Sequence, residues 1–125
     1  MRKMKNSKGF TLMEMLIVVA IIAILVAIMI PVMTTQLERA RETADLANIR
    51  SAYAEASVDA LTNADAATST VKFTQTKADW QYVKDIPEYL TTATGWDTVV
   101  KAATKGTEID VNVAADGTLS FTAHQ

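Results

Sequence analysis

The stretch KGFTLMEMLIVVAIIAILVAIMIPVM, residues 8–33, decides the fold, because most of it has to form a helix that leaves water. Residues 15–33 are 19 consecutive apolar residues, which is long enough to cross a bilayer as a helix. Their Ile, Val and Leu side chains favour insertion by roughly 5 kcal/mol in total, whereas Glu14, near one end, opposes it by at most about 3 kcal/mol. We therefore expect insertion to win, and the carboxylate beside the apolar run needs a reason.

Charge is divided unevenly along the chain. Residues 1–9 hold four of the 12 basic residues and none of the 14 acidic ones, so removing them would change the formal net charge from −2 to −6. A basic segment before an apolar helix stays in the cytoplasm, so we expect a single-pass protein with its N-terminus inside and its C-terminal part outside. The acidic outer part offers no electrostatic footprint for nucleic acid, and we predict no direct binding to it.

The composition also limits the chemistry. The chain has no cysteine, so a thiolate metal site and a Cys nucleophile are not available. Its single histidine, His124, lies one residue from the end and is expected to be solvated, and without it no Ser/His/Asp triad can be proposed. Asp110, Asn112 and Asp116 depart from the spacing of an EF-hand calcium loop. We expect neither an enzyme nor a bound cofactor or metal ion.

The helical pattern continues beyond Pro31, because no Gly or Pro interrupts residues 32–86. Charged residues such as Glu42 and Asp45 are expected to lie mostly off the apolar face. The sequence predicts one helix from about residue 10 to about residue 61, kinked at Pro31, which lacks a backbone donor. The apolar face of its outer half recurs at spacings of three and four residues: Leu46, Ile49, Tyr53, Ala56 and Ala60.

The remaining chain reads as a small sheet with loops. Residues 62–70 are small and polar and predict a loop, and residues 71–76 alternate and predict a short strand. An Asp-Gly turn between residues 108–113 and 118–123 predicts a hairpin. Residues 79–90 are ambiguous apart from a helical turn that could start at Pro87. The fold class is α+β: a long helix, half transmembrane and half amphipathic, packed on a small antiparallel sheet.

Aromatic residues gather between the predicted strands. We expect the amphipathic face of the helix to pack on Phe73, Trp80, Trp96, Val111 and Phe121, since a hairpin alone is marginally stable. Four aromatic residues also leave a second reading open, an exposed binding patch: Trp80, Tyr82, Tyr89 and Trp96.

Residues 8–14, KGFTLME, followed by the apolar run and Pro31, resemble the prepilin signature of type IV pilins and related pseudopilins. The resemblance implies that a prepilin peptidase and methyltransferase cuts between Gly9 and Phe10 and N-methylates Phe10. Glu14 is then the fifth residue of the mature chain. The resemblance is specific over residues 8–33 and says little about the sheet.

This family resemblance implies three segments: a leader of residues 1–9 that is removed, a transmembrane and filament-core helix of residues 10–33, and an extracellular globular domain of residues 34–125. In the family, the amine freed on Phe10 meets the glutamate of a neighbouring subunit. An inner-membrane assembly platform and its ATPase then extrude identical subunits from the cytoplasmic membrane into a helical surface filament. Adhesion, twitching motility and DNA uptake are the functions that the resemblance implies.

Two alternatives stay open. The same N-terminus serves pseudopilins of type II secretion or competence systems. The apolar run is too long for an ordinary secretory signal peptide, but a plain signal anchor carrying a monomeric extracellular binding domain fits it as well.

Overall fold

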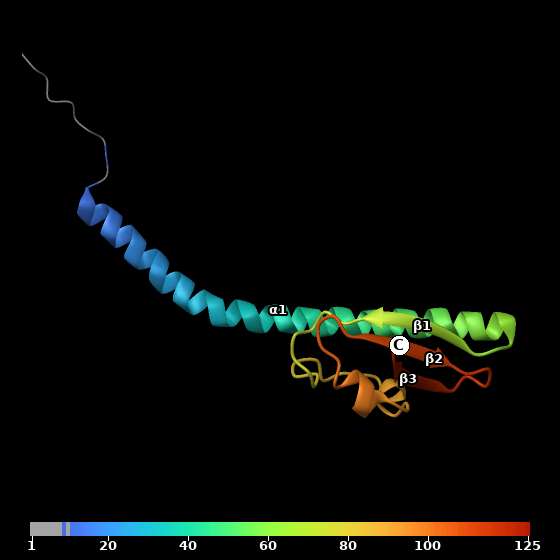
Figure 1. Cartoon of the computed structure of the whole chain (residues 1–125). Helices are drawn as coiled ribbons and strands as arrows, with labels where there is room; N and C mark the ends of the chain where they lie inside the picture. Colours follow the sequence, from blue (N-terminus) through green and yellow to red (C-terminus); the bar gives the residue numbers. More distant parts are fainter. Residues whose placement is uncertain (1–8, 10) are drawn as a thin grey trace, which may run out of the picture. The chain divides into compact units, whose positions relative to one another are not determined.

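The structure is a computed structural model that describes Gly9 and residues 11–125, so the rest of the predicted leader and Phe10 lie outside the described residues. The chain divides into a unit that ends at Thr35 and a globular unit, Gln36–Gln125. Helix α1, Leu12–Asn63, runs through both of them (Figure 1). A long helix followed by a three-stranded antiparallel sheet confirms the predicted α+β class, and both ends of the helix lie within two residues of their predicted positions.

The first part of α1 consists of apolar side chains that are exposed within the subunit. Ile24 is 61% exposed and Leu25 is 58% exposed, and the same holds for the neighbouring Ile, Val and Met residues. This part is long and apolar enough to cross a membrane, and none of its apolar stretch is buried in the structure. A helix that is apolar on all sides has to be covered by lipid or by other helices.

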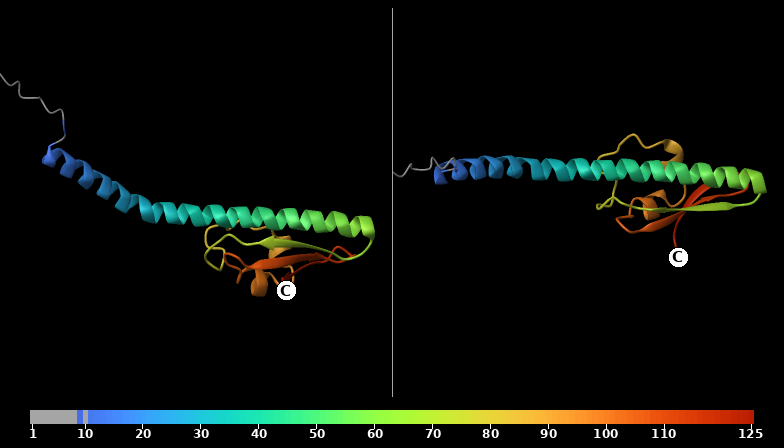
Figure 2. Two further views of the ribbon diagram at one scale, coloured as in Figure 1. Left: turned by 45° about the horizontal axis from the view of Figure 1, so that its top comes forward. Right: turned by 90° about the horizontal axis from the view of Figure 1, so that it is seen from above.

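The outer part of α1 has one buried side. Leu46, Ile49 and Ala52 contribute to the main hydrophobic core, and Ala56 and Ala60 pack with Val113 in a second cluster. Small alanine side chains let the sheet approach the helix closely. Both views in Figure 2 show the sheet along one side of this part of the helix.

The sheet has the order β1-β2-β3, with β1 Ala67–Lys72, β2 Glu108–Val113 and β3 Leu119–Ala123. The β2–β3 hairpin confirms the prediction, and its turn closes where the Gly117 amide donates to the Ala114 carbonyl at 2.9 Å. Ile109, Val111 and Val113 alternate toward the core as their sequence pattern indicates.

The first strand was predicted in the wrong place. Residues 67–70 were assigned to a loop, yet they pair with β2. The Thr68 hydroxyl donates to Asn112 and the Thr70 hydroxyl donates to Asp110, both at 2.7 Å. β-branched threonines suit a strand, and here their polar atoms are satisfied across it. After Phe73 the chain leaves the sheet, because carboxylates of α1 accept the hydrogen bonds of its next backbone amides.

A long excursion joins β1 to β2 and completes the core. It contains the short helix α2, Glu88–Thr91, which follows Pro87 as expected, and the π-helix η1, Trp96–Val100. The predicted packing is confirmed, because one cluster contains Leu46, Ile49 and all five expected partners, with Tyr53 packed against it.

Gly95 is the tightest glycine of the globular unit, and its substitution should be costly. It has a φ of +89°, and a Cβ added to it would clash with the Phe121 carbonyl oxygen. We expect Gly95→Ala to lower the free energy of unfolding by about 2–3 kcal/mol, through left-handed strain plus the clash. Urea unfolding followed by tryptophan fluorescence measures this, because both tryptophans lie in the globular unit.

Gly106 is the matched control for that variant. It has the same φ of +89°, but an added Cβ would meet open space. Gly106→Ala should therefore cost only about 1 kcal/mol, the strain alone. Equal losses for the two variants would contradict the close approach of Gly95 to β3.

Candidate functional site

The start of α1 is built by the residues of the N-terminal motif. The Thr11 backbone N–H donates to Glu14 Oε2 at 3.1 Å, and the Glu14 N–H donates to Thr11 Oγ1 at 3.2 Å. This reciprocal pair is a capping box, which satisfies two amides that the first turn of a helix leaves without partners. The pair explains why the helix begins at Leu12, and it gives Glu14 a role within its own chain.

The predicted processing site lies immediately before this cap. Gly9 is exposed, while Phe10 falls outside the described residues. Glu14 thus stands at the junction between the predicted cut and the exposed apolar part of α1. Among the described residues its carboxylate accepts one hydrogen bond, from the Thr11 amide, and it has further lone pairs that can accept from another donor.

Pro31 lies inside α1, and the helix continues through it. Its carbonyl oxygen accepts hydrogen bonds from the hydroxyls of Thr34 and Thr35, both at 3.0 Å. The predicted kink itself stays a prediction.

A second polar feature occupies the globular unit. Three acidic side chains of α1, which we call the carboxylate clamp, are at least 97% buried: Glu38, Glu42 and Asp45. They hold the segment 74–83 against the helix by accepting hydrogen bonds from its backbone amides. Charged groups are rarely buried unless they are paired or hydrogen-bonded, so these contacts account for their position.

Each member of the carboxylate clamp takes a different part of the segment. Asp45 Oδ2 accepts from the Gln75 amide at 2.8 Å, and Glu38 Oε1 accepts from the Thr76 amide at 2.6 Å. Both carboxylate oxygens of Glu42 accept hydrogen bonds. The Gln81 amide donates to Oε1 at 2.8 Å, and the amides of residues 82 and 83 donate to Oε2 at 2.9 Å. The clamp thus supplies acceptors for a segment outside the sheet.

The sequence interpretation of these acids was wrong. Glu42 and Asp45 were expected off the buried face, yet both are fully buried. The missed signal is spacing, because positions 38, 42 and 45 extend the buried stripe of Ile49 at the same intervals of three and four residues. Acids at core positions indicate backbone donors opposite them.

Glu38 makes the clamp sensitive to acid. Burial raises the pKa of its carboxyl, but the Thr76 hydroxyl, two backbone amides and Arg41 lower it more, so the pKa lies below its usual value near 4.5. A pKa that is lower in the folded state stabilises folding above the unfolded pKa. That contribution is lost as pH falls through the folded pKa.

We therefore expect the urea midpoint of the globular unit to be lower at pH values below about 4.5 than at pH 7. This decrease should be smaller in the Glu38→Gln variant. Tryptophan fluorescence measures both midpoints. The pKa values of Asp110 and Asp116 are also lowered. Burial raises the pKa of Asp110, but hydrogen bonds with Thr70 and His124 lower it more, and hydrogen bonds from Thr118 lower the pKa of Asp116. Their shared contribution cancels in the comparison, and identical pH profiles would contradict the role given to Glu38.

The proposed aromatic patch is wrong for its tryptophans. Trp80 and Trp96 are 7% and 2% exposed and belong to the core, which was the other reading of this cluster. Trp80 stacks on Trp96 with ring centroids 5.8 Å apart. Tyr82 is half-buried. Tyr89 is 48% exposed, and its ring centroid lies 5.5 Å from that of Tyr53.

Comparison with known proteins bears on the N-terminal segment. A family profile described as the prokaryotic N-terminal methylation motif matches residues 4–30. Neither the curated proteins nor the solved structures gave a significant match to the chain. The matched residues include the predicted cleavage site, the capping box and most of the apolar part of α1. The chain thus carries the N-terminal signature of type IV pilin-like and pseudopilin proteins, which is the kind of N-terminus that a prepilin peptidase processes.

Proposed function

We propose that the chain is a structural subunit of a type IV pilus, assembled from identical cleaved and N-methylated copies. The observation that carries the proposal is the methylation motif at residues 4–30, joined to a helix whose apolar part is exposed within the subunit. Such a surface needs a cover, which is lipid before assembly and the equivalent helices of neighbouring copies afterwards. The role is structural rather than catalytic.

Processing would create the contact that assembly needs. Cleavage between Gly9 and Phe10 frees an amine on Phe10, and N-methylation preserves its positive charge. A carboxylate in apolar surroundings is costly until a cation meets it. Glu14 of one copy would receive the amine of the next, so that only cleaved subunits enter the filament core.

The remaining steps follow from this proposal. The chain would cross the cytoplasmic membrane once, with its basic leader inside and residues 34–125 outside. An inner-membrane platform with its ATPase would then extrude it to the cell surface, where adhesion, twitching motility or DNA uptake would be the role of the fibre. A pseudopilin of a secretion or competence system is the second candidate, since it shares the N-terminal motif.

Intact-mass and N-terminal peptide analysis of material sheared from cells tests the proposal. We expect a chain that begins at N-methylated Phe10, in filamentous material. The same mature chain confined to the cell envelope would favour the pseudopilin. Residues 1–9 still attached, in the membrane fraction only, would overturn both in favour of a membrane-anchored monomer.

A further inference from the structure

The outer part of α1 has a second apolar side, which is exposed in the structure. Positions 37, 40, 44, 47, 51, 54, 58 and 61 are all exposed and follow one another at alternating intervals of three and four residues. We call this stripe the α1 seam. It carries Leu37 at one end, Val58 and Leu61 at the other, and alanine or serine between them. These three large side chains are 47%, 64% and 82% exposed.

The α1 seam lies opposite the side of the helix that packs on the sheet. At about 3.6 residues per turn, its positions point roughly 180° away from the buried positions 38, 42, 45, 49, 52 and 56. Figure 1 shows the sheet and its loops on one side of this part of α1. The outer part of the helix therefore has two apolar sides, and the globular unit covers one of them.

The residues beside the α1 seam show that its composition is specific. Between residues 37 and 61, every exposed alanine of α1 lies on the seam, whereas the exposed residues off it are all polar or charged: Arg39, Thr43, Asn48, Arg50, Glu55 and Asp59. Helix propensity alone would distribute alanine over the whole exposed surface and would not select valine for it. This segregation indicates a side of the helix that another molecule covers.

The spacing of the α1 seam indicates what covers it. Intervals of three and four residues average about 3.5, which is the heptad period at which two helices wrap around each other. The seam positions then correspond to a and d, and the positions on its flanks to e and g. Small side chains along its middle allow a second helix axis to approach to about 8 Å. The shape and period of this side therefore fit another helix.

The flanking charges fit a second copy of the same helix. In a parallel pair of identical helices, each g residue lies beside the e residue that comes five positions later in the partner. Arg50 is at a g position and Glu55 at the matching e position, so each Arg50 would meet the Glu55 of the other copy. Arg50 makes no ion pair within the described part of the chain. Glu55 accepts the Ser69 hydroxyl at one oxygen, which leaves further lone pairs.

The other flanking positions agree with this orientation. The remaining pairs of g and e positions, 36 with 41, 43 with 48 and 57 with 62, contain no two like charges. An antiparallel pair would place g beside g and e beside e, so that Arg50 would meet no acidic residue. The charges thus favour a parallel pair in register.

We propose that two copies of the chain pair in parallel and in register along the α1 seam. The interface is two-fold symmetric, so each seam residue lies beside its own equivalent, and the two sheets lie on the outer sides of the helix pair. Successive copies in a helical filament are displaced along the fibre, so equivalent residues do not meet there. The pair is therefore a separate contact, made before the subunits enter a filament.

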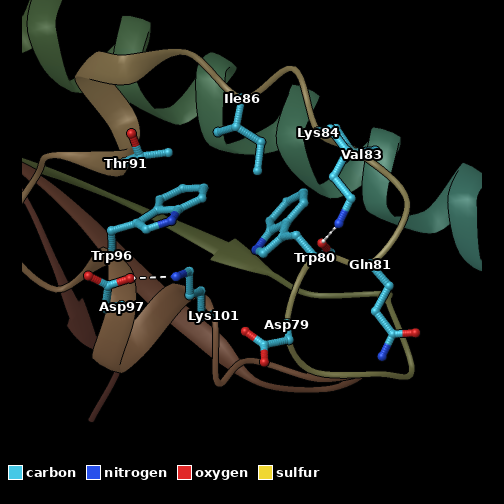
Figure 3. Close-up of a pocket in the computed structure, with 10 residues that line it drawn as sticks. All are labelled: Asp79, Trp80, Gln81, Val83, Lys84, Ile86, Thr91, Trp96, Asp97 and Lys101. Carbon is cyan, nitrogen blue, oxygen red and sulfur yellow. Dashed lines mark hydrogen bonds and ion pairs between the residues drawn. The ribbon is translucent and has the colours of Figure 1, made fainter.

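Disulfide cross-linking tests the pair directly, because the chain contains no cysteine. Ala47→Cys and Ala54→Cys would place two thiols within the Cα separation that a disulfide spans. Arg39→Cys and Asp59→Cys are the matched controls, since both positions are exposed on the same helix but lie off the seam. Gln81→Cys is a control outside the helix, because its exposed side chain points away from α1 (Figure 3).

The full chain is produced in the membrane of a bacterium that has no pilus-assembly proteins and is oxidised with copper phenanthroline. Non-reducing gels then measure the fraction of disulfide-linked dimer. We expect at least about tenfold more dimer from the two seam variants than from the three controls, because only seam residues meet their equivalents. The replaced side chains are exposed, so the core of the globular unit stays intact.

Charge exchange tests the parallel register. In the Ala47→Cys chain, Arg50→Glu or Glu55→Arg alone would place like charges side by side at two points of the interface, and we expect about fourfold less dimer. Both substitutions together should restore the yield. Residues five positions apart do not face each other on one helix, so this rescue requires a second copy.

Three results would overturn the pair. The first is equal cross-linking of seam and control variants, which would indicate random collision in the membrane. The second is a failure of the double charge exchange to restore the yield. The third is efficient cross-linking of a Leu37→Cys chain with a Leu61→Cys chain, which only an antiparallel pair allows. None of these results decides the filament proposal, which the mass of the mature chain in sheared material tests by itself.

Discussion

Replacing Glu42 with alanine is expected to lower the free energy of unfolding of the globular unit by about 3–5 kcal/mol. The side chain is fully buried, and it is the acceptor for three consecutive backbone amides, those of Gln81, Tyr82 and Val83. Alanine would leave these donors without a partner where water has limited access. A loss of this size is a large part of the stability of a small domain.

Urea unfolding of the full chain, followed by tryptophan fluorescence, measures the effect. Glu55→Ala is the matched control, because Glu55 lies on the same helix, is exposed and accepts one hydrogen bond, from the Ser69 hydroxyl at 3.0 Å. Its loss should cost no more than about 1 kcal/mol. If both variants lost the same stability, the clamp would be an ordinary solvated contact.

Glu42→Gln adds a further distinction. The amide keeps one acceptor oxygen, but its NH₂ group would face backbone donors that need an acceptor. We expect a loss between those of the Glu42→Ala variant and the wild type.

The parts of the fold that were predicted correctly depend on regular patterns. The apolar run and its helical continuation place α1, and the alternation of Ile109, Val111 and Val113 around an Asp-Gly turn places the hairpin. These signals are local, because each element carries its own periodicity and its own turn chemistry.

The errors occur where distant groups decide the outcome. β1 begins at Ala67 because Thr68 and Thr70 find partners on β2, some 40 residues later. After Phe73 the chain leaves the sheet because Asp45 and Glu38 accept the hydrogen bonds of the next backbone amides. No local pattern contains these partners, so the loop prediction for residues 62–70 followed from composition alone.

The candidate site shows the same division. Gly9, Phe10 and Glu14 were assigned from a contiguous motif, whereas the carboxylate clamp depends on contacts across the fold. Acids at core spacing were visible in the sequence, but their buried position needs the donors of residues 74–83. The burial of both tryptophans likewise depends on distant partners, because Trp80 packs on Trp96, which also packs on Phe121.

Replacing Glu14 with valine is expected to leave cleavage after Gly9 intact and to lower incorporation of the chain into filaments by at least about a hundredfold. Losing one partner of a desolvated ion pair costs about 3–5 kcal/mol, and each 1.4 kcal/mol is a factor of ten. The mass of the mature chain and its amount in sheared filaments measure the two steps separately. Glu88→Gln, an exposed Glu without an ion pair in the described structure, is the control and should assemble normally.

Glu14→Gln decides which of two roles of the carboxylate matters. Glutamine keeps an oxygen that can accept from the Thr11 amide, so the capping box survives, but the charge that would meet the amine of a neighbouring Phe10 is gone. If the charge is required, the valine and glutamine variants fail alike. If Glu14 only caps α1, the glutamine variant assembles normally, and the contact proposed between Glu14 and the Phe10 amine is wrong. We expect both to fail, because the cap is worth about 1 kcal/mol and the pair several times more.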